Sequence, residues 1–189
     1  MAINDADLIT HIAAGNQEAL RTLYMRYRPR LWRYLWQMLG QNGEWVEEVM
    51  QDIFLAVWSA ARSYQPAISL SPWIFRIARN MALNAQRSHA RRVESHTVSL
   101  GDQDHDNQMG SFSFEDRIVS HLDLHDALRR LSSHHREVLE LHFFHGFSLD
   151  EIASITEVPV GTVKSRLSYA RQALLKQLGE TREGGKSYR

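Results

Sequence analysis

Cysteine is absent from this chain of 189 residues. Its absence excludes disulfide frameworks, thiolate nucleophiles and zinc sites built on cysteine. No apolar run approaches the roughly 20 residues that a membrane-spanning helix needs. The first residues, MAINDADLITHIAAGN, carry acidic groups where a signal peptide would have a basic segment. We therefore expect a soluble cytoplasmic protein without a membrane span.

The chain also lacks an excess of charge of either sign, because 22 Lys and Arg balance 22 Asp and Glu. The charges are nevertheless segregated along the sequence. An acidic cluster at 44–52 precedes a window, 53–93, that contains arginines but neither Asp nor Glu. A second acidic stretch at 102–116 precedes a basic C-terminal segment. Two basic blocks separated by acidic residues indicate two contacts with one polyanion and an acid-faced contact with another partner.

Hydrophobic residues recur with the helical period almost throughout the chain, and no segment alternates as a strand does. Ser71 and Pro72 suit the N-cap and the first residue of one helix. Other helices are expected at about 5–14, 17–39, 44–62, 118–131, 134–145 and 160–178, with a short helix between Ser148 and a turn at 157–159. Because residues 95–114 are polar and lack periodicity, they predict a linker. The fold class is all-α, with small helical domains at 1–92 and 118–180, a flexible acidic linker at 93–117 and a disordered tail at 181–189.

Residues 148–171, SLDEIASITEVPVGTVKSRLSYAR, have the pattern of a helix-turn-helix with a basic second helix. Ser148 is an N-cap candidate, and Glu151 follows at the spacing of a capping box. Apolar residues from Val163 to Leu178 indicate the buried face of the second helix. Its outer side carries Lys164, Ser165, Ser168, Tyr169 and Arg171, near the end that such motifs place in the major groove. The alternative is an amphipathic hairpin with a solvated basic face, which the absence of acids from 158–179 disfavours.

Two further helices carry unusual surfaces. The helix at 44–62 has an apolar stripe, and its remaining surface bears Glu47, Glu48, Gln51 and Asp52. Taken alone, such an acidic face is usually solvated. The helix from Ser71 combines aromatic residues with an arginine-rich surface, which suits single-stranded nucleic acid because bases stack on rings and guanidinium planes. The alternative is that Trp73 and Phe75 only anchor this helix to its neighbours.

Three motifs in this order, EEVMQDIFLAVW, PWIFRIARN and EIASITEVPVGTVKSRL, resemble the extracytoplasmic-function (ECF) class of bacterial sigma factors. The resemblance covers about residues 5–92 and 118–178. It implies a non-enzymatic transcription factor with sigma regions two and four and no cofactor. Such a protein binds core RNA polymerase through the β′ clamp helices and the β flap, recognises two promoter elements, and is controlled by an anti-sigma factor.

The resemblance also assigns roles to residues, none of them catalytic or metal-binding. The contact with core polymerase falls on Glu47, Glu48, Gln51 and Asp52. The minus-ten element falls to Tyr64, Trp73, Arg76, Arg79, Asn80 and Arg87. The minus-thirty-five element falls to Thr162, Lys164, Ser165, Arg166, Ser168, Tyr169 and Arg171.

The chain departs from the family pattern at three positions. Glu157 stands where the pattern prefers glycine, in the turn of the helix-turn-helix. Because a left-handed conformation costs a non-glycine residue about 1 kcal/mol, we expect this turn to differ slightly. Ser132 stands where the pattern prefers proline. Tyr169 replaces a basic residue, which leaves the preferred minus-thirty-five sequence open.

Two alternatives remain for the function. The pairs His121 with His125 and His142 with His145 have metal-compatible spacing, but neither pair has a convincing third ligand, so solvated or hydrogen-bonded histidines are expected rather than a metal or pH sensor.

A free-standing helix-turn-helix regulator would bind operators as a dimer. It would leave the acidic and the aromatic helices without a role, and it would footprint duplex DNA without core polymerase.

Overall fold

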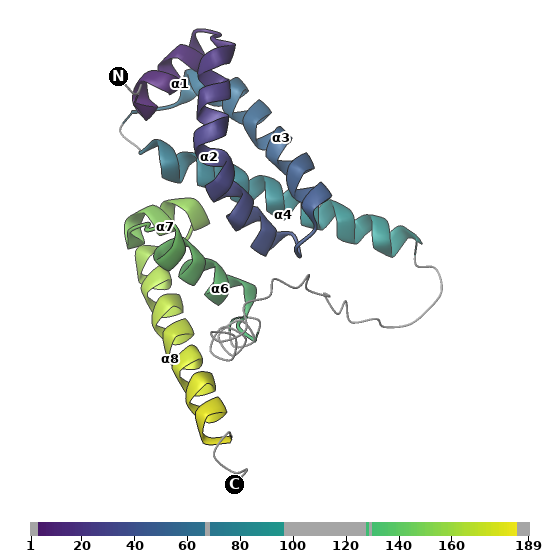
Figure 1. Cartoon of the computed structure of the whole chain (residues 1–189), viewed down its shortest axis with the longest axis vertical. Helices are drawn as coiled ribbons and strands as arrows, with labels where there is room; N and C mark the ends of the chain where they lie inside the picture. Colours follow the sequence, from purple (N-terminus) through teal and green to yellow (C-terminus); the bar gives the residue numbers. More distant parts are fainter. Residues whose placement is uncertain (1–3, 67–68, 97–127, 129, 185–189) are drawn as a thin grey trace, which may run out of the picture. The chain divides into compact units, whose positions relative to one another are not determined.

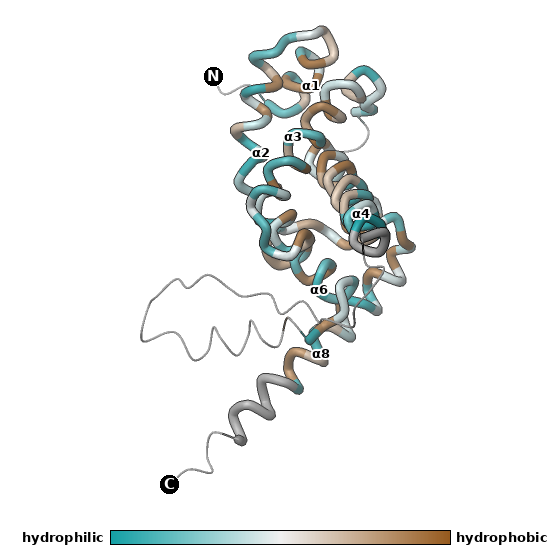
Figure 2. The backbone as a smooth tube through the Cα atoms, turned by 90° about the vertical axis from the view of Figure 1, so that its right-hand side faces the viewer, coloured by the Kyte–Doolittle hydropathy of each residue, from teal (hydrophilic) through white to brown (hydrophobic). Residues whose placement is uncertain are grey.

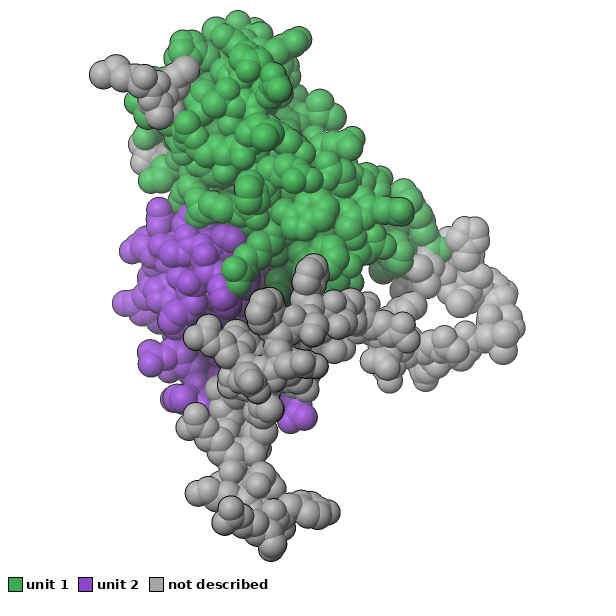
Figure 3. Space-filling view, viewed as in Figure 1, with its two compact units in different colours: residues 1–109 green, residues 110–189 purple. Residues whose placement is uncertain are grey.

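A computed structural model describes the backbone of residues 4–66, 69–96, 128 and 130–184, with side chains except at 93–96 and 177–184 (Figure 1). The described residues form helices and turns, and no strand occurs among them. The all-α prediction is therefore confirmed. The chain divides into two compact units, residues 1–109 and 110–189, which Figure 3 colours separately.

The first unit contains α1 (Asp5–Ala13), α2 (Gln17–Met38), α3 (Gly43–Ala60), a 3₁₀ turn (Ala61–Ser63) and α4 (Leu70–His96). The first three helices share one N-terminal signal. Asn4, Asn16 and Asn42 each accept a backbone N–H through the side-chain oxygen, at 2.8, 3.0 and 3.0 Å. Each N-cap satisfies an N–H group that has no partner within its helix. These asparagines explain why the first helices begin close to the predicted positions.

The core of the first unit lies where the apolar stripes of its helices meet, and Figure 2 follows those hydrophobic residues along the backbone in brown. Every long helix of the unit contributes fully buried side chains, among them Leu8, Ile12, Leu23, Leu31, Leu35, Met50, Ile53, Ile74 and Phe75. Burial of such side chains is the main source of stability, at about 1.5–3 kcal/mol each. The remaining faces of α3 and α4 are therefore available for contacts outside the unit.

The start of α4 differs from the prediction. The helix begins at Leu70, so Ser71 is not its N-cap, and Pro72 is the third helical residue rather than the first. The N–H of Trp73 donates to the carbonyl oxygen of Ser69 at 3.4 Å. Proline is tolerated there because the N–H groups of a first turn have no acceptor within the helix. The helix also continues to His96, into the segment expected to be linker, and the rest of that segment lies outside the described residues.

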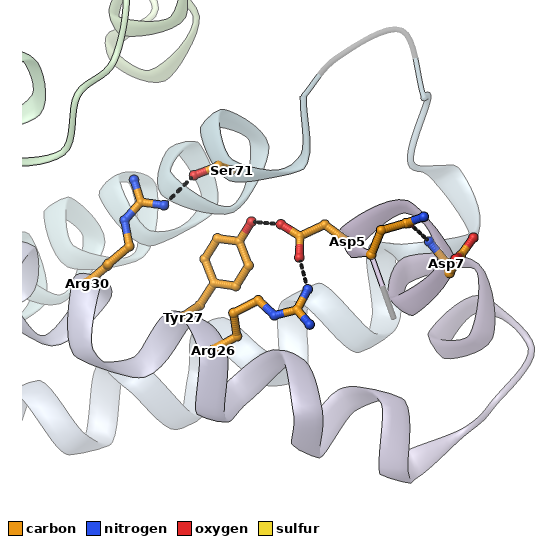
Figure 4. Close-up of polar contacts among 7 residues, drawn as sticks. Asp5, Asp7, Arg26, Tyr27, Arg30 and Ser71 are labelled. Carbon is orange, nitrogen blue, oxygen red and sulfur yellow. Dashed lines mark hydrogen bonds and ion pairs between the residues drawn. The ribbon is translucent and has the colours of Figure 1, made fainter. Parts of the chain in front are cut away.

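A polar cluster joins α1, α2 and the start of α4 (Figure 4). The hydroxyl of Tyr27 donates to Oδ2 of Asp5 at 2.5 Å, and Arg26 pairs with the other oxygen of that carboxylate. Nη1 of Arg30 donates to the hydroxyl of Ser71 at 3.2 Å. Burial, followed by the hydrogen bond and charge of Asp5, raises the pKa of Tyr27 well above its ordinary value. The cluster holds the beginning of α4 against α2.

The second unit contains α6 (Ser133–Leu139), a π-helical turn η2 (Glu140–Phe144), α7 (Leu149–Thr156) and α8 (Val160–Gly184). Two predictions of extent need correction. The helix expected over 134–145 ends in π rather than α geometry, and α8 passes the predicted end at 178 into the expected tail. Residues 185–189 lie outside the described chain, as does most of the helix predicted at 118–131. Val138, Leu141, Ile152, Ile155 and Val163 are fully buried in this unit.

Candidate functional site

One side of α3 is exposed and acidic. Val46, Val49, Met50, Ile53 and Val57 are buried on its opposite side. The exposed side carries a group that we call the α3 stripe, made of Glu44, Glu48, Gln51, Asp52 and Leu55. At about 100° per residue, these positions fall within about 100° of the helix circumference, so they share one helical face. Leu55 is 64% exposed within this polar face, and the sequence reasoning missed it because a leucine at helical spacing is normally core.

Glu47, the fourth predicted polymerase contact, is held differently. It is half-buried at the edge of α3 nearest α2, where Tyr24 donates to its Oε1 and Arg28 to its Oε2, each at 3.4 Å. Arg28 also donates through Nε to the hydroxyl of Tyr24 at 2.9 Å. The charge of Glu47 is therefore balanced inside the unit, whereas Glu48, Gln51 and Asp52 face solvent.

A hollow of about 500 Å³ borders the α3 stripe on the side of α4. Glu48 and Asp52 contribute to one wall, and His89 and Arg92 contribute to the other. The ring of Trp45 lies against His89 with centroids 5.0 Å apart. The stripe therefore combines carboxylates, an exposed leucine and a groove whose two walls carry opposite charge.

The predicted minus-ten residues divide into a buried and an accessible group. Trp73 is only 8% exposed and packs edge-on against Tyr64, with ring centroids 5.1 Å apart. Burial, with a smaller effect of Asp5, raises the pKa of Tyr64. Arg79 is also buried, at 9% exposure. The packing of Trp73 and the full burial of Phe75 agree with the anchoring alternative for those two rings.

Arg76, Asn80 and Arg87 form the accessible group on α4. Arg76 and Asn80 are half-exposed and Arg87 is exposed. Successive residues advance by about 100°, so these three positions lie within a narrow sector of the helix. Nη1 of Arg87 donates to Oδ1 of Asn84 at 3.3 Å, which directs its guanidinium along the helix surface. A strand of nucleic acid that followed this side of α4 would meet two cations and an amide.

The helix-turn-helix has the predicted capping box. The hydroxyl of Ser148 accepts the N–H of Glu151 at 3.3 Å, and the carboxylate of Glu151 accepts the N–H of Ser148 at 2.9 Å. The expectation that the turn would differ is wrong, because Glu157 adopts the left-handed conformation with φ 56° and ψ 40°. Its N–H donates to the carbonyl oxygen of Ala153, which ends α7. The turn thus keeps a left-handed shape without glycine.

The two sides of α8 differ as the sequence predicted. Val163 and Ala170 are fully buried, and Leu167 and Leu174 pack against the cluster formed by Leu131, Leu139 and Ala170. The predicted contact residues Lys164, Ser165, Ser168, Tyr169 and Arg171 are exposed, and Thr162 and Arg166 are half-exposed. A residue that the sequence reasoning missed lies beside them: the ring of His135 stacks on Tyr169. Contacts between positions so far apart leave no local signal in a sequence.

The histidine pairs have internal partners where they are described. Nδ1 of His142 lies 3.0 Å from the carbonyl oxygen of Phe147, and Nε2 of His145 lies 3.5 Å from a carboxylate oxygen of Glu140. Within the described residues, no three His, Asp or Glu side chains are grouped to hold a metal ion. His121 and His125 lie outside the part of the chain that the structure describes. Of the helices in that part, none has the length and hydropathy needed to cross a membrane.

Comparison with known proteins identifies both units. Sigma-70 region 2 matches residues 23–92, and sigma-70 region 4 matches residues 121–174. The chain is 32% identical over 178 residues to the ECF RNA polymerase sigma factor SigL of Mycobacterium tuberculosis, across 92% of this chain and 98% of that protein. It is 31% identical over 166 residues to the RNA polymerase sigma factor CarQ of Myxococcus xanthus, across 88% and 92% of the two chains.

Two solved structures share the fold. CnrH, solved in complex with the cytosolic domain of CnrY, matches with a TM-score of 0.65 and 26% identity over 93% of this chain and 97% of that chain. The sigma factor RpoE of Bartonella quintana, in complex with the anti-sigma factor NepR, matches with a TM-score of 0.64 and 28% identity over 84% and 96%.

A region 2 unit followed by a region 4 unit with a helix-turn-helix defines a promoter-recognition subunit of RNA polymerase. The chain belongs to the extracytoplasmic-function class of RNA polymerase sigma factors. Its function is to bind core RNA polymerase and direct promoter-specific initiation of transcription.

Proposed function

We propose that the chain performs this function in the cytoplasm, without catalysis of its own, through three surfaces. The α3 stripe binds the β′ clamp helices, the accessible side of α4 holds the opened minus-ten element, and the outer side of α8 reads the minus-thirty-five element. One observation carries the proposal. On each of α3, α4 and α8, apolar residues are buried in the unit core, and solvent reaches predicted contact residues on another side of the same helix: Glu48, Gln51 and Asp52 on α3, Arg76, Asn80 and Arg87 on α4, and Lys164, Ser165, Ser168, Tyr169 and Arg171 on α8.

For the polymerase contact, the α3 stripe has the composition of a protein interface. Leu55 supplies an apolar centre of the kind that interfaces bury, and Glu48, Gln51 and Asp52 supply a polar surround. Complementary charge would speed the encounter with a basic partner and fix the register. Glu47 then contributes mainly by orienting α3 on α2 through Tyr24 and Arg28.

For the minus-ten element, the burial pattern gives the six predicted residues two kinds of role. Arg76, Asn80 and Arg87 contact the strand, because their side chains reach solvent on one side of α4. Trp73 and Arg79 support the helix and the loop before it, since both are buried. The ring of Tyr64 packs on Trp73 and is itself partly exposed, so it links the buried Trp73 to the protein surface. Arginine beside an accessible ring suits unstacked bases and their phosphates.

Two protein contacts complete the proposal. Phe143 and Phe144 of the π-helical turn are 59% and 47% exposed, and such aromatic side chains suit the apolar contact with the β flap. An anti-sigma factor that covers the polymerase and DNA surfaces would hold the chain inactive. CnrH and RpoE are each solved with a bound protein, which in the case of RpoE is the anti-sigma factor NepR. Since this chain has no cysteine, thiol-based sensing would belong to the partner.

Run-off transcription with purified core polymerase tests the proposal. The chain with core enzyme is expected to start transcripts from promoters with both elements, and neither component alone is expected to do so. A dimeric operator-binding regulator would instead protect duplex DNA without polymerase and would give no transcript with core enzyme. That second pattern would refute the proposed function.

A further inference from the structure

Tyr169 lies on the outer side of α8, where the family pattern has a basic residue. It is 61% exposed, but one face of its ring is covered. The ring of His135, which projects from α6, stacks on it with centroids 4.7 Å apart and planes 26° from parallel. The rest of the Tyr169 side chain is accessible to solvent, on the side of α8 that also carries the exposed Ser165 and Ser168.

His135 is itself held in place by Ser132, the N-cap of α6. The Ser132 hydroxyl accepts the backbone N–H of His135 at 3.4 Å and lies 3.0 Å from Nδ1 of the same residue. The hydroxyl and the ring nitrogen share one hydrogen bond, whichever of them carries the proton. Ser132 is also a departure from the family pattern, and the proline preferred there has no hydroxyl. His135 therefore joins two departures that are far apart in the sequence.

We propose that Ser132, His135 and Tyr169 form one base-reading element, in which Tyr169 contacts the minus-thirty-five DNA and His135 is a positioning residue. The inference rests on the proposed role of α8 and names the residues that read the bases there. A basic side chain reaches a phosphate from many directions. A tyrosine offers a flat apolar face and one hydroxyl, which distinguish base edges in the major groove only when the ring is oriented. The stack on His135 orders the ring before DNA arrives, so less conformational freedom is lost on binding.

The proposal separates base reading from phosphate binding. Tyr169→Arg is expected to make the dependence of promoter affinity on log salt steeper by about 0.9, because one phosphate contact is added. The same variant is expected to lose base preference at the position that Tyr169 reads. Tyr169→Phe keeps the ring and the stack, so any preference that it loses reports the hydroxyl alone. An unchanged salt slope in Tyr169→Arg would mean that this side chain does not approach the DNA, and would overturn the proposal.

The decisive experiment uses holoenzyme and a promoter library randomised in the minus-thirty-five element. His135→Ala is expected to reduce discrimination at one base position by about three- to tenfold, the size of the effect of an aromatic pair. His135→Phe retains a stacking ring but loses the hydrogen bond to Ser132, so it is expected to keep more of the parental preference than His135→Ala. His134→Ala, which alters the exposed neighbour on α6, is the control and is expected to change nothing.

A double variant tests whether His135 acts through Tyr169. Because a positioning residue works only through the group that it positions, His135→Ala should add no further change of preference in a Tyr169→Ala background. The proposal is overturned if His135→Ala keeps the parental base preference. It is also overturned if His135→Ala changes the preference as much in the Tyr169→Ala background as it does in the parent. If His135→Ala does not fold, His135→Leu replaces it, because leucine fills the space without an aromatic ring. The same loss of base discrimination is then expected for His135→Leu. A parental holoenzyme with no preference anywhere in the element would instead refute the proposed role of α8.

Discussion

Glu157 closes α7 in a conformation that favours glycine, with φ 56° and ψ 40°. In the left-handed region a Cβ atom crowds the following carbonyl oxygen, at a cost of about 1–2 kcal/mol per residue. The capping box at the start of α7 and the buried Ile152 and Ile155 hold α7, and the buried Val163 anchors α8, so the strain persists in the folded chain. The departure from glycine therefore affects stability rather than shape.

Replacing Glu157 by glycine is expected to raise the free energy of unfolding by about 0.5–1 kcal/mol. Relief of the left-handed strain outweighs the greater entropy of glycine in the unfolded chain. Urea titration followed by circular dichroism measures the change. Gln172→Gly, at an exposed right-handed position in α8, is the matched control and should lower stability by about 1 kcal/mol. A loss of stability in both variants would contradict strain at Glu157.

Tyr27 makes the first unit sensitive to alkaline pH. It is 2% exposed, and its pKa is raised by burial first and then by Asp5. The unfolded phenol titrates near its ordinary value of about 10. The stability that depends on the neutral phenol is therefore fully present below that pH and is lost as the pH rises above it.

Tyr27→Phe is expected to lower stability at neutral pH, because Asp5 loses the hydroxyl hydrogen bond, and to lessen the alkaline loss. The difference in unfolding free energy between parent and variant should narrow from pH 9 to pH 11, because ionisation of the phenol stabilises the unfolded parent, whereas the unfolded variant has no phenol at this position. Thermal unfolding across this range measures it. Tyr169→Phe removes an exposed hydroxyl and serves as the control. A difference that stays constant with pH would show that Tyr27 does not couple folding to proton binding.

At the scale of elements, α3 keeps packing and binding on separate sides of one helix. Residues that face the core and residues of the α3 stripe alternate along the chain, so a substitution in the stripe leaves the core unchanged. Exposed substitutions normally alter stability by less than about 0.5 kcal/mol. This separation allows the binding role to be tested without unfolding the unit.

Glu48→Arg with Asp52→Arg is expected to abolish binding to core polymerase while the thermal midpoint stays close to that of the parent. Reversed charges at a complementary interface cost several kcal/mol, because attraction is replaced by repulsion. Co-purification with core enzyme measures binding. Glu18→Arg on α2 reverses an exposed acidic residue outside the stripe and should bind as the parent does. Retained binding by the double variant would exclude the α3 stripe as the contact.

At the scale of the whole molecule, two units with separate cores are joined by one polar segment. Each unit carries one of the two proposed DNA surfaces, so the segment between α4 and the second unit limits how far apart the two surfaces can act. Residues 97–117 can extend to about 70 Å at most. The two promoter elements implied by the family, about 17 base pairs apart, are separated by about 58 Å. The segment is long enough, with little length to spare.

Deleting about half of residues 97–117 is therefore expected to abolish transcription from two-element promoters, because the remaining reach is only about 35 Å. A replacement of the same residues by Gly and Ser at full length should restore it, since reach depends on residue number. Run-off transcription compares the two variants. Binding to core polymerase through the α3 stripe should persist in both. Normal transcription from the half-length variant would show that the tether does not limit promoter use.

The amino-acid sequence alone suffices to predict the fold class, the capping box, the two sides of α8 and the acidic side of α3, because helical periodicity and caps are local properties of the chain. The ends of the helices are harder to predict from the sequence. Ser69 and Ser71 can both precede a first turn, and Pro72 fits at either register, so the start of α4 depended on packing against α2 through Arg30. The π-helical turn at Glu140–Phe144 likewise has no local signature.

Which members of each predicted set face solvent depends on how the helices pack against one another, and the local sequence does not specify it. Glu47 and Glu48 are adjacent and chemically alike, yet one meets Tyr24 and Arg28 while the other is exposed. The sequence allowed the ring of Trp73 to contact DNA, but in the structure Tyr64 packs against it and Trp73 is buried. His135 and Tyr169 come together only because α6 packs on α8. Such contacts join residues that are far apart in the chain, and they form only when whole helices pack together. The local sequence pattern therefore does not predict them.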